Sequence, residues 1–436
     1  MKLKEIKYYI SNYQHLVRNF FSLSILNGLN FLLPLISLPY LVRVIGVERY
    51  GTISFANVIV QYVLLLSTYG FTFSATKLVA QRKGNKEELS NVFNAVVFVK
   101  FSIAIILLLF LFVCVLYIPK LNGEKVLYLY AVGIVLGDVF IPTWFFQGIE
   151  KMQYTTIVNS LSKITFTVLI FIFVKKVDDY PVVLLLNSFG YLFAGLISMI
   201  FIVYTFKIKF KLPAKSDMYF VLVDGWYIFI TTISINLYRN TNTFILGILT
   251  NDVIVGYYSS AEKIIKAVQS IFSPVSEVLF PHFSNKSLIQ GVQSIKENLY
   301  KIFKIYFLIL LALTIALFFF APLIVKILLG MHFDNSIIDV RIMSLVVLFG
   351  CLNYLLGVIG LINIGSQKTF ALYVFISGIS NVLITLILSP YLKDAGAAIG
   401  LLISEVALFV LCYRKLFQTK TFETVDFLNS IKSKSE

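Results

Sequence analysis

Long apolar segments follow one another along almost the whole chain, separated by short polar connections. A helix needs roughly 20 apolar residues to cross the hydrocarbon core of a bilayer. Segments of that length predict twelve membrane spans, at residues 19–42, 52–76, 93–117, 126–147, 154–174, 181–206, 219–247, 253–282, 303–329, 338–363, 369–389 and 395–413. The longest connection, residues 283–302, has room for an amphipathic helix but not for a core of its own. We therefore expect an all-α membrane protein whose function is carried out by residues of the spans.

The composition agrees with a membrane protein and excludes several soluble classes. The chain is 58% hydrophobic and 14% charged, with a mean hydropathy of +0.87, whereas soluble domains have about 25% charged residues. The basic start of the chain runs into the first span without a small-residue cleavage site, so we expect no removable signal peptide. Scattered histidines and cysteines predict neither a metal site nor a disulfide. No GxxxxGK[ST] loop occurs, so we expect no ATPase activity and no cofactor.

The net charge of +15 lies almost entirely outside the spans, because six basic residues inside them are balanced by six acidic residues. With a cytoplasmic N-terminus, 23 Lys and Arg residues fall on the cytoplasmic side and 8 on the other side. Lys and Arg favour the cytoplasmic side of membrane proteins. The alternation predicts an even number of spans and two cytoplasmic termini. It also argues against nucleic acid as the partner of the basic residues.

Two weak repeats suggest that the chain has two matched halves. The motif at Gly51–Ala56 returns at Gly256–Ala261, and the motif at Gly148–Lys151 returns at Gly365–Lys368, with offsets of 205 and 217 residues. A basic connection containing a proline separates six spans from six. We therefore predict two six-helix bundles, residues 1–206 and residues 218–436, joined by a cytoplasmic linker at 207–217. Parallel repeats are typical of transporters that bind substrate between the halves near the midplane.

Polar side chains form stripes at helical spacing on four of the spans. The eighth span carries Ser259, Lys263, Lys266, Ser270, Ser273 and Glu277, and the seventh carries Thr232, Asn236, Arg239 and Thr243. A lysine at mid-membrane costs roughly 2.5–3.5 kcal/mol, so such residues usually face a wet cavity or a helix bundle. Arg239 and Lys263 are expected at similar depths, where they could bind an anion together.

Neutral stripes on the first two spans suit the hydroxyl groups of a sugar. The candidate substrate-binding residues are Arg239, Lys263, Lys266, Asn27, Asn30, Asn57, Gln61, Asn236, Ser259 and Ser270. The structural alternative stays open, because Glu262 and Lys266 form an i,i+4 pair and small polar residues also hold helices together. The isolated charges Lys100, Asp138, Lys163 and Arg341 are expected to be paired or to reach the interface.

Three segments resemble the polysaccharide-biosynthesis flippases, the Wzx-like members of the multidrug/oligosaccharidyl-lipid/polysaccharide (MOP) exporter superfamily. They are Leu38–Gly46 with Glu48, Tyr50–Gly51 and Phe55–Ala56; Trp144–Lys151; and Gly256–Lys263 with Pro281. The resemblance covers the first 165 residues well and the second half more loosely. It implies twelve helices in two lobes around a V-shaped cavity, with Lys263 in the substrate region by motif position. Arg43 and Gly51 are expected to be structural.

The resemblance also implies a function, which is export of an undecaprenyl-pyrophosphate-linked oligosaccharide by alternating access, for O-antigen, capsule or exopolysaccharide synthesis. A proton or sodium gradient could drive it, and a polysaccharide polymerase and a chain-length regulator could be partners. One alternative is a multidrug cation antiporter on the same scaffold, for which Asp138 and Glu405 are the deepest carboxylates. Another is a membrane-embedded polymerase, which would need large outer loops with paired catalytic residues. A scaffold without transport activity is a third.

Overall fold

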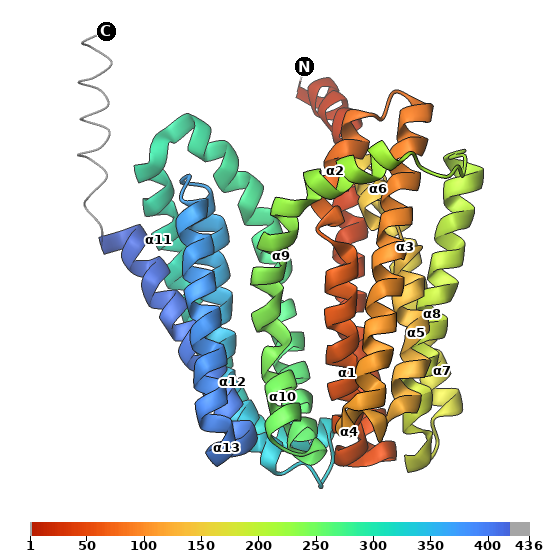
Figure 1. Cartoon of the computed structure of the whole chain (residues 1–436). Coiled ribbons are helices and arrows are strands. Elements are labelled where there is room, and N and C mark those ends of the chain that lie inside the picture. Colours follow the sequence, from red (N-terminus) through yellow and green to blue (C-terminus); the bar gives the residue numbers. More distant parts are fainter. Residues whose placement is uncertain (1, 419–436) are drawn as a thin grey trace. The chain divides into compact units, whose positions relative to one another are not determined.

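The structure is a computed structural model that describes the backbone of residues 2–418 (Figure 1). Side chains are described except for residues 2–27, 29–32, 231–240, 273–295, 297 and 418. The chain forms two compact units, Met1–Lys263 with Leu323–Ser336, and Ile264–Pro322 with Ile337–Glu436. The halves predicted from the repeats are defined by sequence similarity rather than by contacts, and they stay a prediction.

The first unit contains the helices up to the first part of α10. Their bounds are α1 Lys2–Thr68, α2 Phe71–Gln81, α3 Lys86–Tyr117, α4 Pro119–Asn122, α5 Lys125–Val139, α6 Thr143–Gly148, α7 Met152–Phe173, the 3-10 turn η1 Val177–Asp179, α8 Tyr180–Ile200, the π-helical turn η2 Phe201–Thr205, α9 Lys215–Leu249 and α10 Asp252–Ser270. The second unit is built from the rest of α10, most of α11 Ser273–Leu328 and α12 Asn335–Asn353, the π-helical turn η3 Tyr354–Ile362, α13 Gln367–Tyr413 and the π-helical turn η4 Arg414–Gln418.

The helices have the length and apolar character of membrane spans. Within the described residues, eight helices are long and apolar enough to cross a bilayer. Two of them, Leu33–Gln81 and Gln367–Phe417, run for 49 and 51 residues, which is enough for two crossings at roughly 20 residues each. Large apolar side chains of α3 such as Ile106, Leu109 and Phe110 are more than 60% exposed, as expected for a surface that faces lipid.

Several predicted span ends fall at different residues in the structure. The second span ends at Thr68 rather than residue 76, because Tyr69 and Gly70 both have positive φ. The eighth ends at Ser270 rather than 282. The ninth continues back through the predicted connection, since α11 begins at Ser273. In α1 the helical geometry breaks at Gly46, where φ is 75°.

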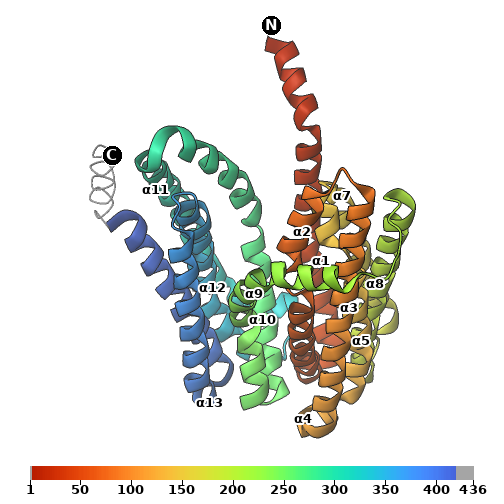
Figure 2. The ribbon, with the colours of Figure 1, turned by 45° about the horizontal axis from the view of Figure 1, so that its top comes forward.

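Helices α5 and α8 are the most closely packed pair within the first unit, and they run side by side with α3 in both views (Figure 1 and Figure 2). A Cβ atom at Gly137 would lie 2.5 Å from the backbone of Tyr191, so only glycine permits this approach. Nearby along the same pair, the hydroxyl of Ser188 donates to the carbonyl of Tyr130. Small residues at such positions are how helices pack tightly in membranes.

An ion pair joins α3 to α5 inside the membrane-spanning region. The ammonium of Lys100 lies 2.8 Å from a carboxylate oxygen of Asp138 and donates to the Asp138 carbonyl, also at 2.8 Å. The Lys100 side chain is only 5% exposed. The expectation that these two isolated charges are paired is therefore confirmed, and their role is structural.

An aromatic cluster closes one end of the first unit. Phe93 of α3 packs on Trp144 and Phe145 of α6, with ring centroids 5.7 and 5.5 Å apart. Phe206 packs on Phe145 from the end of η2, at 5.5 Å. The amide of Asn94 donates to the carbonyl of Lys209 at 2.8 Å. These contacts fix the start of the basic connection to α3 and α6.

The Lys100–Asp138 pair predicts a specific stability pattern. Lys100→Met leaves the Asp138 carboxylate without its cation, which costs roughly 3 kcal/mol for a buried pair. Asp138 is 26% exposed, so water partly compensates its carboxylate and we expect no larger loss of stability than this. We expect a lower thermal unfolding midpoint for the purified protein, and partial recovery in the double variant with Asp138→Asn. A single variant as stable as the wild type would contradict the structural role.

Candidate functional site

The backbones of α1 and α10 meet at two glycines. A Cβ atom on Gly51 would lie 1.7 Å from the carbonyl oxygen of Asp252, and a Cβ atom on Gly256 would lie 2.2 Å from the carbonyl oxygen of Val47. Real Cβ atoms do not approach so closely, and therefore neither position tolerates a side chain in this arrangement. We call this contact the glycine seam.

Equivalent residues of the two sequence repeats face each other along the glycine seam. Gly51 and Gly256 are separated by 205 residues, and so are Val47 and Asp252, whose carbonyls they approach. One turn further along, the hydroxyl of Ser259 donates to that of Ser54 at 3.0 Å, again across 205 residues. Reciprocal contacts between equivalent positions are the mark of a two-fold relation. The repeat inferred from the sequence thus has a structural counterpart.

Asp252, the first residue of α10, links the glycine seam to α1 and α4. Thr52 donates its hydroxyl to a carboxylate oxygen of Asp252 at 2.6 Å. The ammonium of Lys120 lies 3.4 Å from the other carboxylate oxygen and 4.9 Å from the ring centre of Phe55, and it also donates to the Gly247 carbonyl. The charge and hydrogen-bonding groups of Asp252, Lys120 and Thr52 thus compensate one another, and we assign them a structural role.

Arg43 and Arg49, the basic residues of the loop motif, are also in use. Arg43 donates to the carbonyl of Ile327. The guanidinium of Arg49 lies 3.3 Å from the carboxylate of Glu124 and 4.5 Å from the ring centre of Tyr180. The contacts of Arg43 here and of Gly51 in the glycine seam agree with the structural role predicted for both residues.

Lys263 lies two turns beyond the seam glycine of α10, in a different environment. Its half-buried ammonium is 3.4 Å from the hydroxyl oxygen of Tyr50 and 5.7 Å from the centre of that ring. The described part of the chain places no carboxylate within ion-pair distance of it. A phenol oxygen compensates a buried positive charge only weakly, so Lys263 retains the capacity to bind an anion.

Amide side chains follow the same face of α1. Asn57 and Gln61 are half-buried, and neither has a hydrogen-bond partner among the described side chains and backbone. Their neighbours are paired instead, since Tyr62 donates to Thr241 at 3.5 Å and Asn242 donates to the Tyr258 hydroxyl at 3.0 Å. Asn57 and Gln61 therefore have unused donors and acceptors of the kind that bind sugar hydroxyls.

The remaining predicted residues either have contacts of their own or have side chains outside the described residues. Ser259 belongs to the seam itself. Lys266 and Ser270 belong to the second unit, where Lys266 is exposed and Ser270 donates to the Ala267 carbonyl at 2.6 Å. The side chains of Arg239, Asn236, Asn27 and Asn30 lie outside the described residues, although their backbones are helical in α9 and α1.

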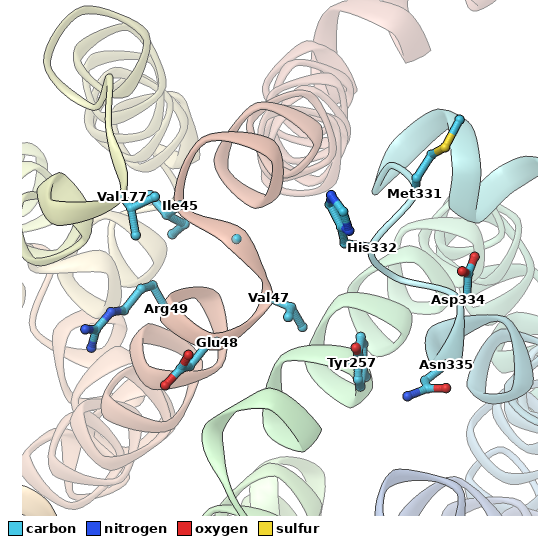
Figure 3. A pocket seen from close by; sticks show the side chains of 11 residues that line it. Ile45, Val47, Glu48, Arg49, Val177, Tyr257, Met331, His332, Asp334 and Asn335 are labelled. Carbon is cyan, nitrogen blue, oxygen red and sulfur yellow. The ribbon is translucent and has the colours of Figure 1, made fainter.

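The first unit also contains a pocket of about 840 Å³ (Figure 3). Its lining residues come from the break in α1, from η1 and α10, and from the turn before α12: Ile45, Gly46, Val47, Glu48, Arg49, Val177, Tyr257, Met331, His332, Asp334 and Asn335. Figure 3 shows the Arg49 guanidinium pointing away from His332 and Asp334. None of the predicted site residues lines this pocket, so it is distinct from the Lys263 region.

Sequence reasoning missed the partners of the predicted residues. In the sequence, Tyr50 is part of the loop motif, and no pattern indicates a role for Tyr258 or Asn242. An aromatic residue next to a glycine gives no sign of which helix its hydroxyl will reach. The useful signal is the repeat offset, because it makes Ser54 and Ser259 equivalent positions, which the structure brings into contact.

In the described part of the chain, the long apolar helices define a multi-pass membrane protein. The reciprocal contacts of the glycine seam are typical of transporters that contain repeats. The model of the polysaccharide biosynthesis protein family matches residues 16–287. The chain belongs to this family, as its loop and turn motifs predicted.

Two curated relatives match over almost their whole length. One is a protein of Escherichia coli (strain K12) provisionally named O-antigen transporter, 31% identical over 91% of this chain and 95% of the relative. The other, from Shigella dysenteriae and with the same provisional name, is 26% identical over 89% of this chain and 97% of the relative. Both names describe transporters rather than enzymes.

Solved structures give the fold. The lipid II flippase MurJ in an inward closed conformation matches with a TM-score of 0.72 at 15% identity, covering 95% of this chain and 89% of MurJ. An inward-facing multidrug resistance MATE family transporter of the MOP superfamily matches with a TM-score of 0.69 at 15% identity, covering 90% and 94%. The predicted MOP exporter fold is confirmed.

The glycine seam can be tested by adding one methyl group to each side. We expect Gly51→Ala and Gly256→Ala each to lower stability by about 1–3 kcal/mol or more, because the added Cβ overlaps backbone atoms that no rotamer change can move. Thermal unfolding of the purified protein in detergent measures this loss. Gly84→Ala is the matched control, since a Cβ there meets nothing within 4 Å. Seam variants as stable as that control would contradict the close approach.

Proposed function

We propose that this protein is a flippase for undecaprenyl-pyrophosphate-linked oligosaccharide repeat units, serving O-antigen, capsule or exopolysaccharide synthesis by alternating access. Its family membership supports transport of a polysaccharide precursor. The observation that carries the proposal is a set of half-buried polar side chains on α1 and α10. Within the described residues, Lys263 contacts only the Tyr50 hydroxyl, and Asn57 and Gln61 have no hydrogen-bond partner. A pyrophosphate headgroup calls for cations, and a glycan calls for hydrogen-bonding amides.

The multidrug antiporter is the main rival, and the charges of the first unit give it little support. A cavity for organic cations needs a carboxylate that is not neutralised. Asp138, one of the two acids deep enough for that role, is neutralised by Lys100 at 2.8 Å. The likeness to the MATE transporter, at 15% identity, is a likeness of fold.

The proposal includes an orientation. With both termini in the cytoplasm of a bacterial inner membrane, the turns at residues 43–51 and 329–335 would lie on the outer side, together with the pocket of Figure 3. The excess of Lys and Arg on the opposite side supports this orientation. A polymerase and a chain-length regulator would then receive the flipped unit on the outer face.

Charge reversal at the two candidate cations tests the proposal. In Lys263→Glu with Arg239→Glu, two attractions for a pyrophosphate become repulsions, each worth roughly 1.5–3 kcal/mol when a charged hydrogen bond is lost. We expect surface polysaccharide to fall at least about tenfold. Lipid-linked repeat units should accumulate in the inner leaflet. Immunoblots of surface glycan and extraction of lipid-linked intermediates measure the two effects.

Lys304→Glu is the matched control, because Lys304 also lies over a tyrosine ring, 4.6 Å from the centre of Tyr300, but on the exposed face of α11. It should leave surface glycan unchanged. Wild-type surface glycan in the double variant, at wild-type protein levels in the membrane, would refute the assignment of the cations. Loss of polymerised glycan with normal flipping would point to a polymerase instead.

A further inference from the structure

Two acidic side chains meet inside the second unit, far from the glycine seam in sequence. Asp339 lies in the first turns of α12, and Asp394 directly follows the break in α13 at Lys393, where φ is 54° and ψ is −128°. Their carboxyl groups are within hydrogen-bonding contact of each other. Asp339 is 0% exposed and Asp394 is 9% exposed. Nothing in the proposed transport mechanism uses this pair.

The two carboxyl groups differ in what surrounds them. Asp394 lies where the helix resumes after the break, next to the backbone amides of Asp394 and Ala395 and to the charge of Lys393. These neighbours can stabilise a negative charge on Asp394. Asp339 has nothing comparable, because neither of its oxygens receives a hydrogen from any group in the described part of the chain.

A buried carboxylate without a donor is costly, by several kcal/mol even after the protein relaxes. Among the described residues, the polar neighbour of Asp339 is the carboxylate of Asp394, which has no hydrogen to donate unless one of the two is protonated. A single proton resolves the conflict. As a neutral acid, Asp339 has one O–H donor, which it can give to the Asp394 carboxylate. Two carboxyl groups that share a site hold one proton jointly for this electrostatic reason.

A metal ion fits the pair less well than a proton does. Among the described residues, no group of three or more His, Cys, Asp or Glu side chains could hold a metal ion. One further oxygen is nearby in the chain, the hydroxyl of Ser389, which is 0% exposed and has no partner in the described structure. A sodium ion would need several more oxygen ligands, whereas a proton needs only the two carboxyl groups.

We propose that Asp339 and Asp394 form a proton-binding site, which holds one exchangeable proton between the N-terminal part of α12 and the break in α13. The site is independent of the cargo, so its existence does not rest on the proposed function. In the orientation proposed above it would face the outer side of the membrane. A proton gradient would act on the second unit at this point.

The test uses the full-length protein in detergent and infrared difference spectra between near-neutral and strongly alkaline buffer. We expect the wild type to show the carbonyl band of a buried carboxylic acid that disappears on alkalinisation. Asp339→Asn should remove the band, and so should Asp394→Asn. A pH-indicator dye should count about one proton fewer released by each variant than by the wild type. Asp138→Asn is the control that should keep the band, because Asp138 is paired with Lys100.

Asp339→Asn also separates a proton site from a merely structural hydrogen bond. The amide that this substitution introduces can still donate to Asp394, so the fold and the melting temperature at near-neutral pH should be kept while the titrating proton is lost. A band that survives in both variants, or that is absent from the wild type, would overturn the proposal. So would a melting temperature raised by sodium chloride over choline chloride in the wild type alone, since sodium would then be the ligand.

Discussion

The close approach of two helix backbones at Gly51 and Gly256 is the contact on which the rest of the first unit depends. Each glycine accommodates a carbonyl oxygen of the other helix, and the two contacts are equivalent under the same shift of 205 residues. This geometry sets where Ser54 meets Ser259 and brings Tyr50 of α1 to Lys263 of α10. A repeat that could be taken for chance in the sequence therefore acts as a physical constraint on the position of the candidate cation.

The charged residues of the membrane-spanning region differ in whether an oppositely charged partner lies beside them. Lys100 is neutralised by Asp138, so the cost of placing it in a low-dielectric medium is offset within the protein. Among the described residues, the polar partner of Lys263 is a phenol oxygen, and that of Asp339 is another acid. A buried ionisable group without an oppositely charged partner lowers the stability of the fold, which favours a functional role for it. We interpret the first as a substrate contact and the second as a proton site.

The sequence predicted the fold class, the family and the repeat, because apolar length and motif offset are local properties. It did not predict the break at Tyr69–Gly70, since a left-handed residue can interrupt a helix without changing its apolar character. It also did not predict that α10 ends at Ser270. Helical spacing placed Lys263 and Lys266 on one stripe, yet one is half-buried beside Tyr50 and the other is exposed. The contact between Asp339 and Asp394 was missed because it depends on tertiary packing of residues 55 positions apart.

Disulfide formation between cysteines placed at Ser54 and Ser259, in a variant whose three native cysteines are replaced, tests the seam and its role in transport together. The hydroxyl oxygens of these serines are 3.0 Å apart. The account predicts that mild oxidation of membranes links the two cysteines, and that linkage stops glycan export until a reductant is added. Cysteines that react with a maleimide but do not join under oxidation would show that α1 and α10 do not meet through equivalent residues.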